Sequence, residues 1–218
     1  MFAYPKQAEV NRIVPKARIY AHGKVSKRVK ELFATQVAEI VWKYKLSPET
    51  INLPACKGIN EIQVFEIALK STELDSGVLQ AIDKGIPFPL LFELTHGGEI
   101  RFAASFKQPA GADASKWIIE ASFETELQPS NAERLALPVA LDLASLYEQI
   151  IRRHIPLPSR PAESITEHVA RFIALEAKKK MQAQLESRLG REKQFNRKVE
   201  LNAALRSLSK ELKTLMKC

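Results

Sequence analysis

The residues best suited to chemistry are three glutamates and one lysine in the first third of the chain, Glu39, Glu61, Glu66 and Lys70. Glu66 and Lys70 are four residues apart in a predicted strand, so their side chains share one face of it, and Glu61 lies at its start. Glu39 falls on the predicted preceding helix. Metal-dependent nucleases use such sets, in which carboxylates hold a divalent cation and a lysine positions or activates water. A nuclease is therefore one alternative.

The spacing of this acidic set favours a structural interpretation. Nuclease motifs on a strand usually place the acid and the lysine two residues apart, whereas Glu66 and Lys70 are four apart. A glutamate and a lysine that neutralise each other at the end of a sheet explain the same residues. We leave the catalytic residues unassigned and whether the protein is an enzyme open, with a non-enzymatic role preferred.

Other chemistry has little support in the sequence. The glycine-rich phosphate-binding motifs and the nucleophile elbow are missing, which argues against nucleotide hydrolysis and α/β-hydrolase chemistry. Cys56 has no histidine predicted nearby to activate it. The histidines lack metal-ligand spacing, so we expect no metal site and no cofactor; they are His22, His96, His154 and His168.

Hydrophobic periodicity predicts a mixed α/β sheet. Apolar residues recur at spacings of three and four from Val25 to Tyr44, which predicts one amphipathic helix ending near Lys45. Residues 61–70 predict a central strand, 73–84 a helix, and the next strand begins after Gly85, so these two strands should be parallel. Further predicted strands are 87–94, then 100–107 beyond a glycine hairpin loop at 96–99, and an edge strand at 117–126.

The strand signals stop after residue 131. Val139, Leu143, Leu146 and Ile150 indicate a helix that ends before Pro156, and a proline-rich linker follows. From residue 164 onward the composition predicts helix almost throughout. The predicted organisation is a mixed α/β domain (α+β or α/β) at 1–130, a connecting helix and linker at 131–160, and a basic, coiled-coil-like helical tail at 161–218.

Leucines in the tail predict a helical packing seam. They keep a 4-3-4-3 spacing and suggest an oligomer or partner interface made of Leu201, Leu205, Leu208, Leu212 and Leu215. An earlier stripe points to nearly the opposite side of the same helix; it comprises Met181, Leu185, Leu189 and Val199. Either the helix breaks near Gly190 into a hairpin, or it stays continuous and contacts its own domain and a second subunit. We prefer the continuous helix, which implies a homo-oligomer, over an ordinary helical pair closing over one sheet face.

Positive charge is concentrated in the same tail. Residues 151–218 contain 16 Lys/Arg and 7 Asp/Glu, whereas residues 1–150 contain 17 and 18. Such a stretch suits phosphate contacts, although a solvated helix face with internal ion pairs is the simpler alternative. No base-reading motif accompanies it, so DNA or RNA would be bound through the backbone. The candidate residues are Lys178, Lys179, Lys180, Arg188, Arg191, Lys193, Arg197 and Lys198.

Sequence signals for export or membrane insertion are missing. No apolar stretch approaches the roughly 20 residues of a membrane span. The start has no secretory layout, and two cysteines are too few for a disulfide framework. We expect a cytoplasmic protein that does not span a membrane.

Several strings together resemble the bacterial family catalogued as domain of unknown function 4391: NRIVPKARIY, YKLSPETINL, EIQVFEIALK, IDKGIPFPLLFEL, the strand ending in SFK, and EKQFNRKVELN. The resemblance spans nearly the whole chain and brings no assigned activity. It implies a gene neighbourhood of helicase-like ATPases and DNA methyltransferases in clusters that look like restriction or anti-phage islands. It directs attention to Lys16, Lys70 and Lys107, and to Gln194, Asn196 and Asn202, which could set helix register in the tail.

The expected function is that of a non-enzymatic accessory protein in a bacterial DNA-processing or anti-phage defence system. It would bind a larger partner, a helicase or methyltransferase, and nucleic acid through its basic helices. The alternatives are the metal-dependent nuclease and a purely structural oligomeric scaffold held by the tail.

Overall fold

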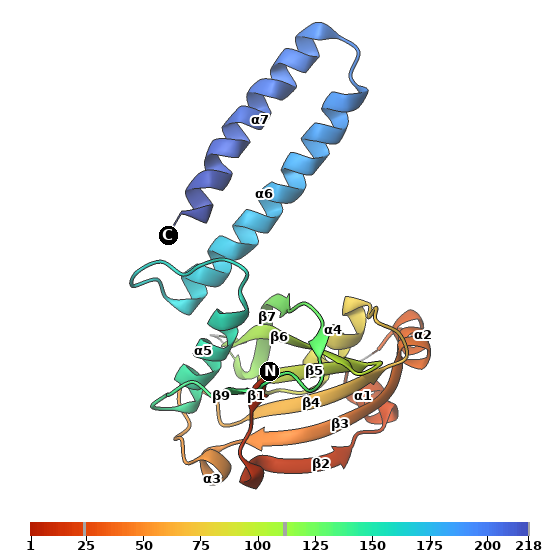
Figure 1. The fold of residues 1–218 in the computed structure, drawn as a ribbon, viewed down its shortest axis with the longest axis vertical. Coiled ribbons are helices and arrows are strands. Elements are labelled where there is room, and N and C mark those ends of the chain that lie inside the picture. The colour runs from red at the N-terminus through yellow and green to blue at the C-terminus, as the bar shows by residue number, and fades with distance from the viewer. Residues whose placement is uncertain (24, 111–112, 218) are drawn as a thin grey trace. The chain divides into compact units, whose positions relative to one another are not determined.

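The computed structural model describes residues 1–23, 25–110 and 113–217 and divides the chain into two compact units, Met1–His154 and Ile155–Cys218. The first unit is a mixed sheet with helices, and the second is a pair of long helices (Figure 1). The predicted fold class, a mixed α/β domain with a long helical C-terminal extension, is confirmed. Within the described ranges, none of the helices combines the length and apolar composition that a membrane crossing needs.

The first unit is built on a seven-stranded sheet in the order β2-β3-β4-β5-β6-β7, with β8 paired to β6. All neighbouring strands are antiparallel except β4 and β5, which are parallel and joined through α4, as predicted. The short strands β1 and β9 pair separately. The strands are β1 (Phe2–Ala3), β2 (Glu9–Ile13), β3 (Val37–Leu46), β4 (Ile62–Leu69), β5 (Leu90–His96), β6 (Glu99–Ala110), β7 (Asp113–Glu124), β8 (Gln128–Pro129) and β9 (Leu135–Ala136).

Helices cover one face of this sheet with a shared hydrophobic core. Phe65 and Ile67 of β4 point into that core, where Phe33 of α2 and Val78 of α4 are fully buried. Alternate residues of β4 therefore face opposite sides, which leaves Glu66 on the other face. The helices of this unit are the 3-10 turn η1 (Lys6–Ala8), α1 (Lys16–Gly23), α2 (Lys27–Gln36), α3 (Pro48–Ile51), α4 (Ser76–Gly85) and α5 (Leu143–His154).

The helix predicted up to Lys45 is wrong in its second half. Helix α2 ends at Gln36, and residues Val37–Leu46 form β3. This segment is rich in β-branched and aromatic side chains, which favour a strand, and its pairing with β4 overrides the helical spacing of its apolar residues. Glu39 therefore lies on a strand and not on a helix.

Two lysines that are distant in sequence close the C-terminal end of α2. Lys16 Nζ donates to the carbonyls of Phe33 and Val37, at 3.1 and 2.5 Å, and Lys70 Nζ donates to the carbonyl of Ala34 at 2.7 Å. The last carbonyls of a helix lack intrahelical donors, and positive charge is favoured at that end. Tertiary contacts thus help to fix the helix-to-strand boundary.

The hairpin between β5 and β6 is confirmed, and so is the edge position of β7. Gly97 and Gly98 have φ values of 57° and 86°, which glycine adopts without a steric penalty. The predicted helix around Leu143–Ile150 is α5, although Val139 lies before its start and is 93% exposed. The two-residue strand β9 was not predicted.

The second unit is a helical hairpin of α6 (Ile165–Arg191) and α7 (Phe195–Met216), which lie side by side (Figure 1). Our preference for a continuous helix is therefore wrong. The turn falls just after Gly190, where Glu192 accepts hydrogen bonds from the backbone N–H groups of Lys193 and Gln194. These bonds satisfy donors near the start of the second helix, and folding back gives its leucines a packing partner.

Candidate nucleic-acid interface

The leucine seam of α7 packs inside the hairpin. Leu208 and Leu212 are buried, and the other three predicted leucines are half-buried. On α6, Leu175 is buried and Leu185 and Leu189 are half-buried at the spacing of a facing seam. The earlier predicted stripe does not pack as one surface. Its members Leu185 and Leu189 are half-buried, whereas Met181 and Val199 are each 52% exposed.

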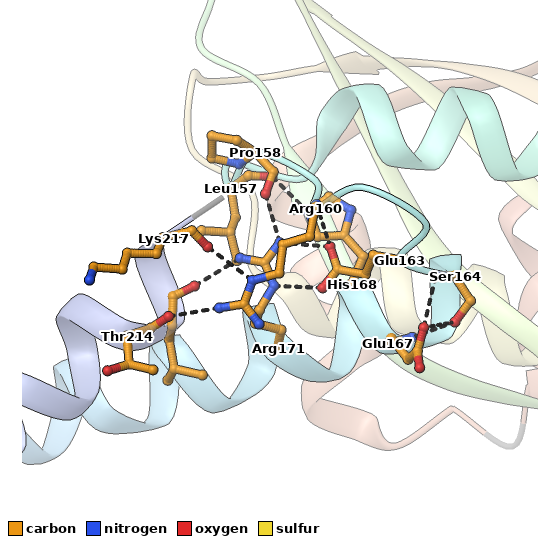
Figure 2. Close-up of polar contacts among 11 residues, drawn as sticks. Leu157, Pro158, Arg160, Glu163, Ser164, Glu167, His168, Arg171, Thr214 and Lys217 are labelled. Carbon is orange, nitrogen blue, oxygen red and sulfur yellow. Dashed lines mark hydrogen bonds and ion pairs between the residues drawn. The ribbon is translucent and has the colours of Figure 1, made fainter.

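A polar cluster ties the two helices together at the end of the hairpin away from the turn. Arg171 forms two bonds to Glu163, at 2.6 and 2.8 Å, and donates to the carbonyls of Leu215 and Pro158 (Figure 2). Arg160 donates to the carbonyls of Thr214 and Lys217. The hydrogen bond from Arg171 lowers the pKa of Glu163 to about 2. The cluster thus anchors the C-terminal end of α7 while the turn stays exposed.

The eight predicted cations fall into two groups. Three have carboxylate partners: Lys178 pairs with Glu211 across the hairpin, Lys179 with Glu176 at 2.8 Å, and Arg197 with Glu192 at 4.0 Å. The other five are exposed and form no ion pair with any residue that the structure describes; they are Lys180, Arg188, Arg191, Lys193 and Lys198. Internal pairing thus accounts for only part of the basic stretch.

The unpaired cations concentrate at the turn, which we call the hairpin tip (Arg188–Lys198). An open groove of about 530 Å³ lies there, lined by Arg188, Arg191 and Arg197 together with Glu192, Glu200, Leu201 and Ala204. Phe195 is 78% exposed at the same tip. Guanidinium groups present planar donors suited to phosphate oxygens, so the tip offers a site for an extended polyanion.

The polar residues expected to set helix register lie outside the leucine seam. Gln194 is the residue before α7, Asn196 is exposed in its first turn, and Asn202 Nδ2 donates to the carbonyl of Lys198 at 2.9 Å. All three are exposed, so that expectation is wrong.

The predicted acidic set is not brought together at one point. Glu39 and Glu66 share a face of the β3–β4 pair, where Glu66 lies 3.6 Å from Lys43. Glu61 instead pairs with Lys45 at 3.2 Å, and Lys70 is the lysine that caps α2. Among the described residues, no three His, Cys, Asp or Glu side chains are placed to hold a metal ion.

Beside Glu66 lies an ion pair between a buried carboxylate and a partly exposed arginine, which sequence analysis missed. Glu66 is opposite Glu93 in the parallel β4–β5 register, and Glu93 is 1% exposed. Arg134 binds both carboxylate oxygens of Glu93, at 2.7 and 3.0 Å, and also donates to the carbonyl of Phe2. The two hydrogen bonds neutralise the buried carboxylate of Glu93, and the bond to Phe2 connects the N-terminal segment to the sheet through Arg134. Nothing local in sequence links residues 41 positions apart.

The chain belongs to the family described as domain of unknown function (DUF4391), whose model matches residues 2–212. No curated protein and no solved structure matches the chain.

Proposed function

We propose that this member of the DUF4391 family is a non-enzymatic accessory protein of a bacterial DNA-processing or anti-phage defence system, and that it binds nucleic acid through the hairpin tip. The observation that carries the proposal is the group of exposed cations around the groove at the tip that form no ion pair with any residue in the described ranges. Because these cations form no ion pair with the residues that the structure describes, they remain available to contact a polyanion.

The mode of binding follows from the chemistry of the tip. Each phosphate neutralised by Lys or Arg releases condensed counterions, so the affinity is independent of base sequence and falls steeply with salt. The two glutamates that line the groove, Glu192 and Glu200, repel an anion and limit where it can lie. We expect Arg188 and Arg191 to make the main contacts, since they line the groove without a carboxylate partner among the described residues.

The first unit would supply the contact with a larger partner, a helicase or methyltransferase. Val139 and Leu141 are 93% and 87% exposed in the segment before α5, an unusual exposure for large apolar side chains. Capture of the partner from the native host should therefore be lost when Val139→Asp and Leu141→Asp are combined. Capture of the same partner at the same level by this variant would contradict the assignment.

The nucleic-acid part is tested by fluorescence anisotropy with labelled single strands and duplexes at about 50 mM salt. The tip variant Arg188→Gln/Arg191→Gln/Lys193→Gln should lose at least about tenfold in affinity, because three phosphate contacts are removed. A matched control with the same change in charge carries Lys6→Gln, Lys27→Gln and Lys84→Gln, all exposed in the first unit. The control should bind as the wild type does.

Two outcomes would contradict the proposal. Equal affinity of the tip variant and the control would remove the tip from the interface. Cleavage of DNA by the purified protein with Mg²⁺ or Mn²⁺, abolished by Glu66→Ala, would show a nuclease in place of a non-enzymatic accessory protein.

A further inference from the structure

Helix α7 carries a second basic surface on the side opposite its leucines. With an advance of about 100° per residue, the leucine seam occupies one side of the helix and four cations at 4-3-4 spacing occupy the other. All four side chains are exposed. We call this surface the α7 stripe, and it consists of Arg206, Lys210 and Lys213 of α7 and of Lys217, the residue that follows the helix.

The acidic side chains of α7 do not neutralise the α7 stripe. The two carboxylates of α7, Glu200 and Glu211, lie on the other side of the helix, where Glu200 lines the tip groove and Glu211 pairs with Lys178. Among the described residues the four cations form no ion pair. Like charges four residues apart repel by a few tenths of a kcal/mol per pair, so the stripe slightly destabilises the isolated helix.

We infer that the α7 stripe is a track for a nucleic-acid backbone that continues from the hairpin tip along α7. The inference rests on the proposed function. From Arg206 to Lys217 the stripe covers about 16 Å, at 1.5 Å per residue, which corresponds to roughly five phosphates of a base-stacked strand at 3.4 Å per nucleotide. Counted from Lys198 at the tip, the track is about 28 Å long and spans roughly eight nucleotides.

The hairpin favours nucleic acid over an anionic membrane surface as the occupant. A helix that lies on a membrane inserts an apolar face beside its basic face. The apolar face of α7 is its leucine seam, whose Leu208 and Leu212 are buried within the hairpin. From Arg206 to Lys217 the stripe carries charged side chains, and the large exposed apolar residues on the same side of α7, Phe195 and Val199, lie at the tip or next to it. The stripe is therefore a charged surface on a helical support, and a continuous chain of phosphates matches that form.

Binding of single-stranded oligonucleotides of about 4, 8, 12 and 20 nucleotides at about 50 mM salt tests the track. The wild type should gain affinity steeply up to about eight nucleotides, because longer strands reach from the tip onto the stripe. The stripe variant Arg206→Gln/Lys210→Gln/Lys213→Gln should reach its plateau near four nucleotides, and its slope of log affinity against log salt should be shallower by about 2. Glutamine is a good helix former, so helicity should be unchanged.

The outcomes separate this inference from the proposed function. If the stripe variant keeps the length profile of the Lys6→Gln/Lys27→Gln/Lys84→Gln control while the tip variant loses binding, the track is overturned and the tip assignment stands. If the wild type binds no oligonucleotide, both fail. If the stripe substitutions abolish binding to vesicles of phosphatidylserine and phosphatidylcholine but leave oligonucleotide binding intact, the stripe belongs to a membrane contact and the inference is wrong.

Discussion

Lys107 and Asp83 form an ion pair of 2.8 Å whose two side chains have no exposed surface. Lys107 Nζ also donates to the carbonyls of Asp83, Ile86 and Phe88, at 2.7, 3.2 and 2.9 Å, and Asp83 accepts a 2.6 Å bond from Ser105. Burial lowers the pKa of Lys107 and raises the pKa of Asp83. The pair ties β6 to the end of α4 and to the segment that leads into β5.

Removing the lysine from this pair should strongly destabilise the first unit. Lys107→Met leaves Asp83 buried without its counter-charge, and we expect a loss of about 3–5 kcal/mol in the free energy of unfolding. Urea unfolding followed by tryptophan fluorescence measures it. Lys84→Met, an exposed neighbour, is the control and should change stability by less than about 0.5 kcal/mol.

The double variant distinguishes loss of charge balance from loss of packing. Asp83→Leu/Lys107→Met removes both charges and should recover much of the stability lost in Lys107→Met, since apolar replacement of a buried pair is often tolerated. A Lys107→Met variant within about 1 kcal/mol of the wild type would contradict this account of the ion pair.

Glu163 predicts how the stability of the hairpin depends on pH. Its pKa is about 2 when folded because Arg171 binds the carboxylate, against an ordinary value near 4.5. A carboxylate whose pKa is lower in the folded than in the unfolded state stabilises the fold at pH values above its unfolded pKa. This stabilisation is lost as the pH falls from about 4.5 to about 2. Thermal unfolding of the wild type and of Glu163→Gln, followed by circular dichroism, should therefore differ most above pH 5.

The comparison is specific because other carboxylates titrate equally in both proteins. At neutral pH we expect Glu163→Gln to be less stable by about 1.5–3 kcal/mol, the range for a hydrogen bond to a charged group. The difference should shrink to a few tenths of a kcal/mol near pH 2, where about half of the Glu163 carboxylates are protonated. A constant difference between pH 6 and pH 2 would show that the charge of Glu163 does not stabilise the hairpin.

The leucine seam predicts a graded set of alanine effects. Leu208→Ala creates a cavity at a buried position and should lower the free energy of opening of the hairpin by about 2 kcal/mol or more. This corresponds to at least about thirtyfold faster amide hydrogen exchange in α6 and α7. Leu201→Ala, half-buried beside the tip groove, should have a clearly smaller effect. Equal effects of the two variants would contradict the packing described.

Local sequence patterns predict those parts of the fold whose determinants are also local. The parallel β4–α4–β5 unit follows from its apolar runs, and the β5–β6 hairpin follows from Gly97 and Gly98. The strand at 37–46 is different, because its apolar spacing also suits a helix. What places the boundary there is pairing with β4 and the capping of α2 by Lys16 and Lys70.

The candidate interface could be predicted only in part. The density of cations predicts that the interface lies in the tail. Which cations are neutralised depends on the hairpin, because Lys178 contacts Glu211 only when α7 folds back against α6. The α7 stripe could have been found from the 4-3-4 spacing of Arg206, Lys210, Lys213 and Lys217, which mirrors that of the leucines. The pair of buried Glu93 with Arg134 has no comparable signal, because its partners come from separate parts of the chain.

The most direct test of the nucleic-acid interface is the salt dependence of duplex binding between about 50 and 200 mM salt. If the five unpaired cations of the basic stretch contact phosphates, the slope of log affinity against log salt should be about −4 or steeper for the wild type. For Arg188→Gln/Arg191→Gln/Lys193→Gln the slope should be shallower by about 2–3. Equal slopes for the two proteins, or a wild-type slope near zero, would contradict the account.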